Sequence, residues 1–204
     1  SFTPLNLHCD SHFGKWHTVD LSHYYGAWVT PHVEAVQARI RRAAEHWPQR
    51  QIWGYQGTPE SVPQQVAALY QALREAEIVY VNSVIDYGAP PGTYTQRTRL
   101  PRESLALKSA NCIDGTVLMA SLLEGASLSP AIVLVPGHAF LAWETWQDSD
   151  EWRYLETTLI GTADFDAACQ AGQRQYDFHQ KQSPALVKRL PLHELRARGI
   201  WPME

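Results

Sequence analysis

The spacing of apolar residues predicts two helices in the N-terminal half of the chain. In the first, Thr30 suits a helix cap, Pro31 suits the first helical position, and Pro48 ends the pattern. Its apolar positions recur at helical spacing at Val33, Val36, Ile40, Ala43, Ala44 and Trp47. In the second, Ser61 and Gln64 have the spacing of a capping box. Its apolar positions are Val62, Val66, Leu69, Tyr70 and Leu73.

Shorter elements are predicted between these helices and residue 109. Ile52-Trp53 and residues 78–81 have the pattern of short strands, and residues 102–108 that of a short helix. Residues 48–60 and 86–94 contain several glycines and prolines, which predicts loops.

The stretch from Ser109 to His138 is the most continuously apolar part of the sequence. Asn111 suits an N-cap, and Asp114 stands at the third helical position of a capping-box variant with a shorter acid. The helix that follows is apolar around most of its circumference, and such helices are normally buried. Its apolar residues are Ile113, Val117, Met119, Ala120, Leu122 and Leu123. The chain then turns at Gly125.

Three strands are predicted after this helix, at residues 131–135, 138–144 and 152–158. Further helices are expected at residues 162–182 and 192–198, the latter stopped by a glycine. The order of elements predicts an α+β fold in which the apolar helix packs on an antiparallel sheet, with additional helices before it.

Composition indicates an ordinary globular chain with no nucleic-acid surface. Apolar residues make up 45% of the 204 residues and charged residues 19%, enough for one substantial core. The formal net charge is −4, and the sequence has no basic stripe. No stretch approaches membrane-spanning length, and no signal-peptide pattern opens the sequence. Residue 1 is Ser, which is compatible with a domain cut from a longer polypeptide.

The cysteines and histidines predict no disulfide framework and no metal site. Cys9, Cys112 and Cys169 are an odd number without a C-x-x-C pair, which favours a reducing, cytoplasmic setting. The early segment, residues 1–29, holds several histidines at spacings that match no zinc pattern. We therefore expect no metal and no cofactor, and interpret residues 1–30 as an N-terminal extension or an edge of the domain.

Cys112, His138 and Glu156 are the candidate catalytic residues. A cysteine in the first turn of a helix meets unpaired N–H groups and the positive end of the helix dipole, which favour the thiolate. His138 begins the second of the three strands predicted after this helix. If the loop between that strand and the third is centred near residue 147, Glu156 lies directly opposite His138. A carboxylate there can accept one imidazole N–H and leave the other nitrogen for the thiol.

These residues lie in three blocks that resemble the core of the bacterial transglutaminase-like superfamily, which shares the papain-type fold. The blocks are the Asn-Cys-Ile-Asp-Gly run containing Cys112, the Val-Pro-Gly-His-Ala-Phe run containing His138, and Tyr-Leu-Glu-Thr-Thr containing Glu156. The likeness covers about residues 96–160, within one domain spanning residues 1–204. Glu156 is a departure, since Asp is commoner at that position of the superfamily.

The resemblance implies acyl transfer through a thioester on Cys112, with His138 moving the proton. The expected substrate is a protein or peptide, and Gln96 is the expected side-chain donor to the oxyanion. The leading hypothesis is a cysteine peptidase or amidase. One alternative is a protein transamidase, which crosslinks glutamine to an amine or deamidates it, since hydrolysis and transamidation would use the same residues. The other is a non-catalytic protein-interaction module that kept the fold. Further domains of the same polypeptide are the other expected partners, and neither nucleic acid nor a membrane is expected.

Overall fold

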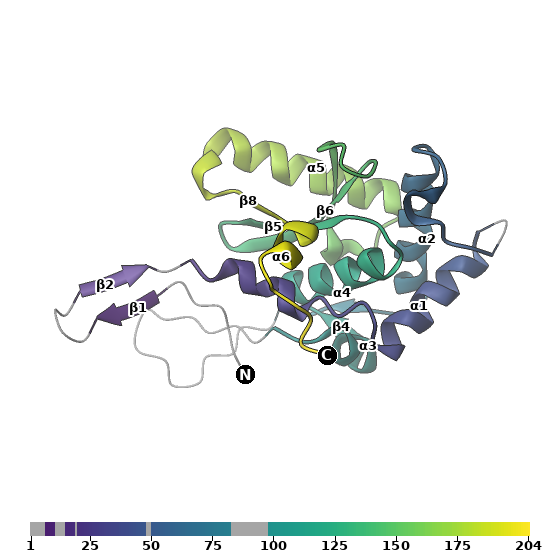
Figure 1. Cartoon of the computed structure of the whole chain (residues 1–204), viewed down its shortest axis with the longest axis horizontal. Coiled ribbons are helices and arrows are strands. Elements are labelled where there is room, and N and C mark those ends of the chain that lie inside the picture. The colour runs from purple at the N-terminus through teal and green to yellow at the C-terminus, as the bar shows by residue number, and fades with distance from the viewer. Residues whose placement is uncertain (1–6, 11–14, 19, 48–49, 83–97) are drawn as a thin grey trace.

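The structure, a computed structural model, describes residues 7–10, 15–18, 20–47, 50–82 and 98–204 (Figure 1). It confirms the α+β class. Its centre is a four-stranded antiparallel sheet in the order β7-β6-β5-β8. The strands of this sheet are β5 (Pro130–Val135), β6 (His138–Glu144), β7 (Trp152–Leu155) and β8 (Lys188–Pro191).

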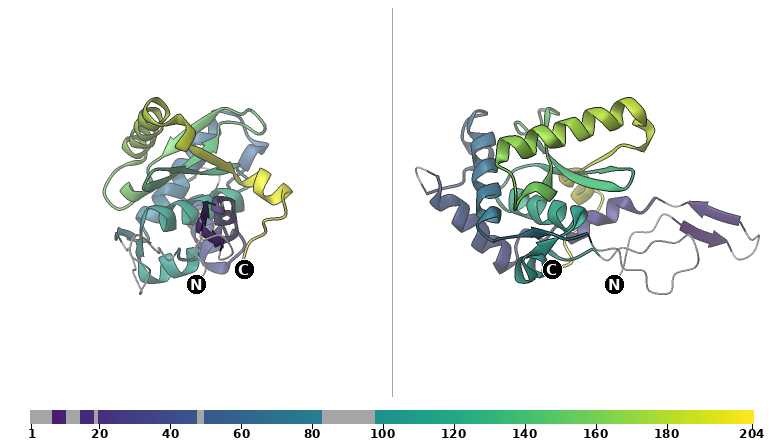
Figure 2. Two further views of the ribbon diagram at one scale, coloured as in Figure 1. Left: turned by 90° about the vertical axis from the view of Figure 1, so that its left-hand side faces the viewer. Right: turned by 180° about the vertical axis from the view of Figure 1, so that it is seen from behind.

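Helices cover both faces of the sheet. The α-helices are α1 (Glu34–Glu45), α2 (Ser61–Arg74), α3 (Pro101–Leu107), α4 (Cys112–Gly125), α5 (Phe165–Gln182) and α6 (Leu192–Ala197). In Figures 1 and 2, α4 lies on one side of the sheet with α1, α2 and α3 around it, and α5 lies along the other side. The 3-10 helices are η1 (Ser22–Trp28), η2 (Gly54–Gln56), η3 (Thr157–Leu159) and η4 (Pro184–Leu186).

Two further pairs of strands lie outside the central sheet. β1 (Leu7–Asp10) pairs antiparallel with β2 (Lys15–Thr18). β3 (Val79–Tyr80) runs parallel to β4 (Ser109–Ala110), the strand that leads into α4. The start of α4 therefore lies between the β3–β4 pair and the central sheet.

Strand alternation divides the core into two parts. Leu141 of β6 and Leu155 of β7 are fully buried on the α4 side. Phe140 and Tyr154 belong to a second, smaller cluster on the α5 side. There the ring of Tyr154 stacks on Tyr176 of α5, with ring centroids 4.0 Å apart. Successive residues of one strand thus face different helices, as the period of two requires.

α4 is the buried centre of the fold, as its apolar sequence predicts. Every residue from Ile113 to Leu123 is buried, and most of them have no exposed surface. The predicted cap is also confirmed: the Asn111 side chain accepts a hydrogen bond from the Asp114 N–H at 2.9 Å. A helix buried on all sides gives its first residue a fixed position relative to the sheet.

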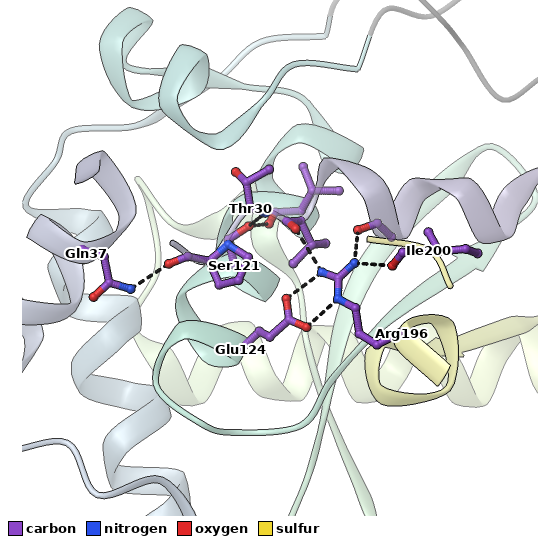
Figure 3. A network of polar contacts seen from close by, with 10 residues as sticks. Thr30, Gln37, Ser121, Glu124, Arg196 and Ile200 are labelled. Carbon is purple, nitrogen blue, oxygen red and sulfur yellow. Dashed lines mark hydrogen bonds and ion pairs between the residues drawn. The ribbon is translucent and has the colours of Figure 1, made fainter. Parts of the chain in front are cut away.

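An arginine near the C-terminus ties three distant segments together (Figure 3). Arg196 of α6 forms a bidentate pair with Glu124 at the end of α4, at 2.8 and 2.7 Å. The same guanidinium donates to the carbonyl oxygens of Gly26 and Val29 and to that of Ile200. These bonds fix the end of η1 and the C-terminal segment against α4.

Some sequence predictions of local structure were wrong. α1 begins at Glu34 rather than Pro31, because Val33 is the N-cap. No strand forms at Ile52-Trp53, because the buried Gln65 side chain accepts hydrogen bonds from the Trp53 and Gly54 N–H groups, both at 2.8 Å.

The second helix is present, but its predicted capping box is not. The Ser61 hydroxyl donates to the Thr58 carbonyl at 2.7 Å and does not cap α2.

Three further expectations concern strands, loops and membranes. β7 ends at Leu155, where a strand to residue 158 was expected, because the chain turns into η3. The sequence patterns did not predict η1 or β8. The loop expected at residues 86–94 lies outside the described residues. Within the described ranges, no helix is long and apolar enough to cross a membrane.

Candidate active site

Cys112 is the first residue of α4, and its position is fixed by the cap that precedes it. Asp114 completes the cap, since its carboxylate accepts hydrogen bonds from the Asn111 N–H at 3.4 Å and the Arg99 N–H at 2.8 Å. Burial raises the pKa of Asp114, while these bonds act in the other direction. At the first helical position, the N–H of Cys112 has no partner within the helix and is free to donate to a ligand.

The hydroxyls of two threonines lie close to the carbonyl oxygen of Cys112. The hydroxyl of Thr116 donates to it at 2.7 Å, and that of Thr157 lies 3.5 Å from it. The two hydroxyls are 3.2 Å apart. Gly115 permits this approach, because a Cβ there would lie 3.2 Å from the Thr157 hydroxyl oxygen. The start of α4 is thus packed directly against the segment that follows Glu156.

His138 and Glu156 are in direct contact. The Nε2 atom of His138 lies 2.7 Å from Oε2 of Glu156, and only 6% of the Glu156 side chain is exposed. His138 follows the tight turn of Pro136 and Gly137, in which Gly137 has a φ of +73°. Because Nε2 faces the carboxylate, Nδ1 is the nitrogen left for a thiol.

The strand register differs from the one expected. β6 and β7 pair Leu141 with Leu155, so continuing the ladder puts Phe140 opposite Glu156. Glu156 and His138 are therefore diagonal neighbours, not directly opposed residues. The expected loop centre near residue 147 was one residue too early. Diagonal pairs have Cα atoms about 7–8 Å apart, within reach of a long side chain.

The second carboxylate oxygen of Glu156 is held by Thr158. Oε1 accepts hydrogen bonds from the Thr158 N–H at 3.1 Å and from its hydroxyl at 2.8 Å. Burial acts to raise the pKa of Glu156, but the hydrogen bond and charge of His138, with these bonds from Thr158, lower it below its ordinary value. The carboxylate is thus ionised and fixed in orientation.

The pKa of His138 depends on both Cys112 and Glu156. Burial acts to lower the pKa of His138. Hydrogen bonds with Cys112 and Glu156, and the charges of both groups, outweigh burial and raise the pKa to about 10. The structure therefore brings the three sequence-predicted residues together, with an imidazole that is readily protonated between two acidic groups.

The site opens on a cleft of about 470 Å³ that is lined by Cys112 and His138. Tyr25 of η1 also lines it. Burial raises the pKa of Tyr25, and the nearby Cys112 adds to that effect. Sequence analysis assigned no role to Tyr25 or to Thr116, Thr157 and Thr158. The only available signal was that two threonines directly follow Glu156.

Other sequence candidates contribute less. Gln96, the expected oxyanion donor, lies outside the described residues, as does the side chain of Cys9. Cys169 is partly buried on α5, and burial raises its pKa to about 12, which disfavours its thiolate. No group of three or more His, Cys, Asp or Glu in the described parts of the chain is arranged to hold a metal ion.

Comparisons with protein-family models, with curated proteins and with solved structures gave no match.

Proposed function

We propose that this protein is a cysteine-dependent acyl-transfer enzyme, most simply a peptidase or amidase, with a core of the papain-like, transglutaminase-like type. The proposal rests on the 2.7 Å contact between His138 and Glu156 and on the position of Cys112 and His138 on the wall of the same cleft. A nucleophile, a base and an orienting acid gathered at one site are the requirements for nucleophilic catalysis by a thiol. The resemblance of the three sequence blocks to the superfamily points to the same chemistry.

In the first half of the reaction, the Cys112 sulfur attacks the carbonyl carbon of an amide, and the carbonyl oxygen becomes an oxyanion. The Cys112 N–H at the start of α4 is a suitable donor to that oxygen. As the carbon–nitrogen bond breaks, His138 gives its proton to the departing amine. A thioester on Cys112 remains.

In the second half, water attacks the thioester and His138 takes one of its protons. The carbon–sulfur bond then breaks, which releases the carboxylic acid and restores the starting pair, with one proton held between Cys112 and His138. Glu156 keeps the imidazole oriented throughout, since both of its carboxylate oxygens are engaged. The substrate of this reaction is a protein or peptide amide.

Transamidation is the second candidate, because an amine can replace water in the same final step. Product analysis with and without a primary amine would separate the two reactions. Hydrolysis gives an acid in both cases, whereas transamidation gives an amide that contains the added amine.

A small activated ester tests the proposal without knowledge of the natural substrate. We expect the protein to hydrolyse p-nitrophenyl acetate through an acetyl group on Cys112, detectable as an added mass on the peptide that contains this residue. Cys112→Ala should abolish turnover and keep the fold, and Cys169→Ala should be nearly silent. Turnover by Cys112→Ala at the wild-type rate would overturn the proposal.

A further inference from the structure

The cleft beside Cys112 has mainly apolar walls. Ile113 follows Cys112 on α4, and most of the other apolar residues come from the end of β5, the turn after it and the start of β6. Leu186 of η4 contributes from the C-terminal part of the chain. The apolar lining residues are Ile113, Leu134, Val135, Pro136, Ala139 and Leu186.

Apart from Cys112 and His138, the one charged group that lines the cleft, among the described residues, is already paired. Lys188 of β8 forms an ion pair with Asp20 at 2.8 Å. Asp20 is held in turn by Ser22, whose N–H donates to it at 3.0 Å and whose hydroxyl donates at 2.5 Å. The hydrogen bond from Lys188, helped by those from Ser22, lowers the pKa of Asp20 to about 2. The Asp20 carboxylate is therefore ionised at neutral pH and balances the charge of Lys188.

Among the described residues, His138 is paired with Glu156 and Lys188 with Asp20, so a charged side chain in this cleft would find no free opposite charge. It would lose water without an ionic partner, which is unfavourable. An apolar side chain would bury its surface against the lining residues and leave the ion pair intact. The volume of about 470 Å³ is within the range of about 300–1,000 Å³ typical of ligand pockets.

We infer that this cleft is a subsite for a large, uncharged apolar side chain of the peptide, next to the carbonyl that Cys112 attacks. The inference rests on the proposed function and adds a substrate class to it. Cys112 and His138 line the same cleft, so a side chain bound in it belongs to the acyl part of the substrate or to a residue close to it.

A set of peptide electrophiles tests the subsite. N-acetyl amino-acid chloromethyl ketones with leucine, alanine, glutamate or lysine side chains would be compared. In each, the Cys112 sulfur bonds to the methylene carbon and chloride leaves. We expect the leucine probe to label Cys112 at least about tenfold faster than the alanine probe, since burial of one extra methylene is worth about 10- to 200-fold in a hydrophobic pocket. The glutamate and lysine probes should be slower than leucine.

Two exposed leucines provide a variant and its matched control. Leu186, at the cleft, is 57% exposed, and Leu107, at the end of α3, is 61% exposed. For Leu186→Asp, the ratio of the leucine-probe rate to the iodoacetamide rate should fall about tenfold. Leu107→Asp should keep the wild-type ratio. Leu186→Ala provides a milder change, with a smaller fall in the same direction.

The outcomes separate the inference from the proposed function. Equal rates for all four side chains, with Cys112 still selectively labelled by iodoacetamide, would overturn the apolar subsite and leave the nucleophile in place. A faster rate for the glutamate or lysine probe would also overturn it. Failure of iodoacetamide to prefer Cys112 over Cys169 would instead overturn the proposed function.

Discussion

The imidazole of His138 lies 2.7 Å from the carboxylate of Glu156, although the two residues are not opposite each other in the sheet. The last pair of the β6–β7 ladder is Leu141 with Leu155, and extending it by one residue puts Phe140 opposite Glu156, so the contact is diagonal. A diagonal contact needs a longer side chain than a direct one. This geometry gives a physical reason for the longer Glu, rather than Asp, at position 156.

Shortening the acid should therefore weaken the site. Glu156→Asp removes one methylene, about 1.5 Å of reach, and so separates the carboxylate from the imidazole. Glu156→Gln keeps the length but offers an amide that can favour the wrong tautomer of His138. We expect both variants to lower kcat/KM by at least about tenfold and by less than the 10⁴-fold known for loss of the acid in a serine triad. Steady-state kinetics on p-nitrophenyl acetate would measure the loss.

Glu144 is the matched control for these variants. It is also buried in β6 and accepts a hydrogen bond from the Asp150 N–H at 2.9 Å, but it stands at the far end of the strand. At about 3.3 Å per residue, it lies about 20 Å from His138. Glu144→Gln should keep the wild-type kcat/KM. Equal values for Glu144→Gln and Glu156→Gln would contradict the role given to Glu156.

Thr158 should act on catalysis through Glu156. Thr158→Val removes the hydroxyl that donates to the Glu156 carboxylate at 2.8 Å and keeps the shape of the side chain. A hydrogen bond to a charged group is worth about 1.5–3 kcal/mol, so we expect kcat to fall at least about tenfold. Thr158→Ser, which keeps the hydroxyl, should retain most of the activity. If Thr158→Ser is as slow as Thr158→Val, the hydroxyl does not position the acid.

The pH dependence of stability should report the paired imidazole. The pKa of His138 is raised from 6.5 to about 10, so protonated His138 stabilises the folded protein fully below pH 6.5. This contribution should disappear as the pH rises from 6.5 to about 10. We expect the difference in free energy of unfolding between wild type and His138→Gln, from urea denaturation, to shrink over that interval.

Glu156 should give the opposite sign in acid. Its pKa is lowered from 4.5, so its stabilising contribution is present above pH 4.5 and is lost as the pH falls through the lowered value. The difference between wild type and Glu156→Gln should shrink on acidification. A difference that stays constant with pH in both experiments would mean that the two groups do not pair in the resting protein.

Gly115 should matter more for catalysis than for stability. In Gly115→Ala, the added Cβ would press on Thr157, which holds the Cys112 carbonyl. Alanine is favoured over glycine inside a helix by about 1 kcal/mol, which offsets part of the crowding. We expect a melting temperature close to that of wild type and a reduced kcat/KM. A large loss of stability with unchanged kcat/KM per folded molecule would contradict this assignment.

Local sequence signals predicted the helix and strand that carry the cysteine and the histidine. The Asn111 cap and the start of α4 depend only on neighbouring residues, so they could be predicted. β6 begins at His138, as predicted, because Pro136 and Gly137 mark the turn before it.

The remaining features depend on contacts between distant residues. β8 contains Lys188 and Arg189 and lacks an apolar alternation, and its pairing with β5 forms across a long stretch of sequence. The contact between Thr157 and the Cys112 carbonyl joins residues 45 positions apart. The register of β7 is set by a loop in which Asp148 and Asp150 adopt positive φ angles, and a polar sequence alone does not fix such a turn.

The central claim is that Cys112 is a nucleophile activated by His138, and the rate of alkylation by iodoacetamide tests it most directly. Mass spectrometry of digested protein would follow Cys112 and Cys169 in wild type and in His138→Ala at neutral pH. We predict that Cys112 is modified at least about tenfold faster than Cys169 in wild type, and that His138→Ala removes most of that advantage, because a thiolate requires a stabilising neighbour. Equal rates for the two cysteines, or a Cys112 rate unchanged in His138→Ala, would contradict the account.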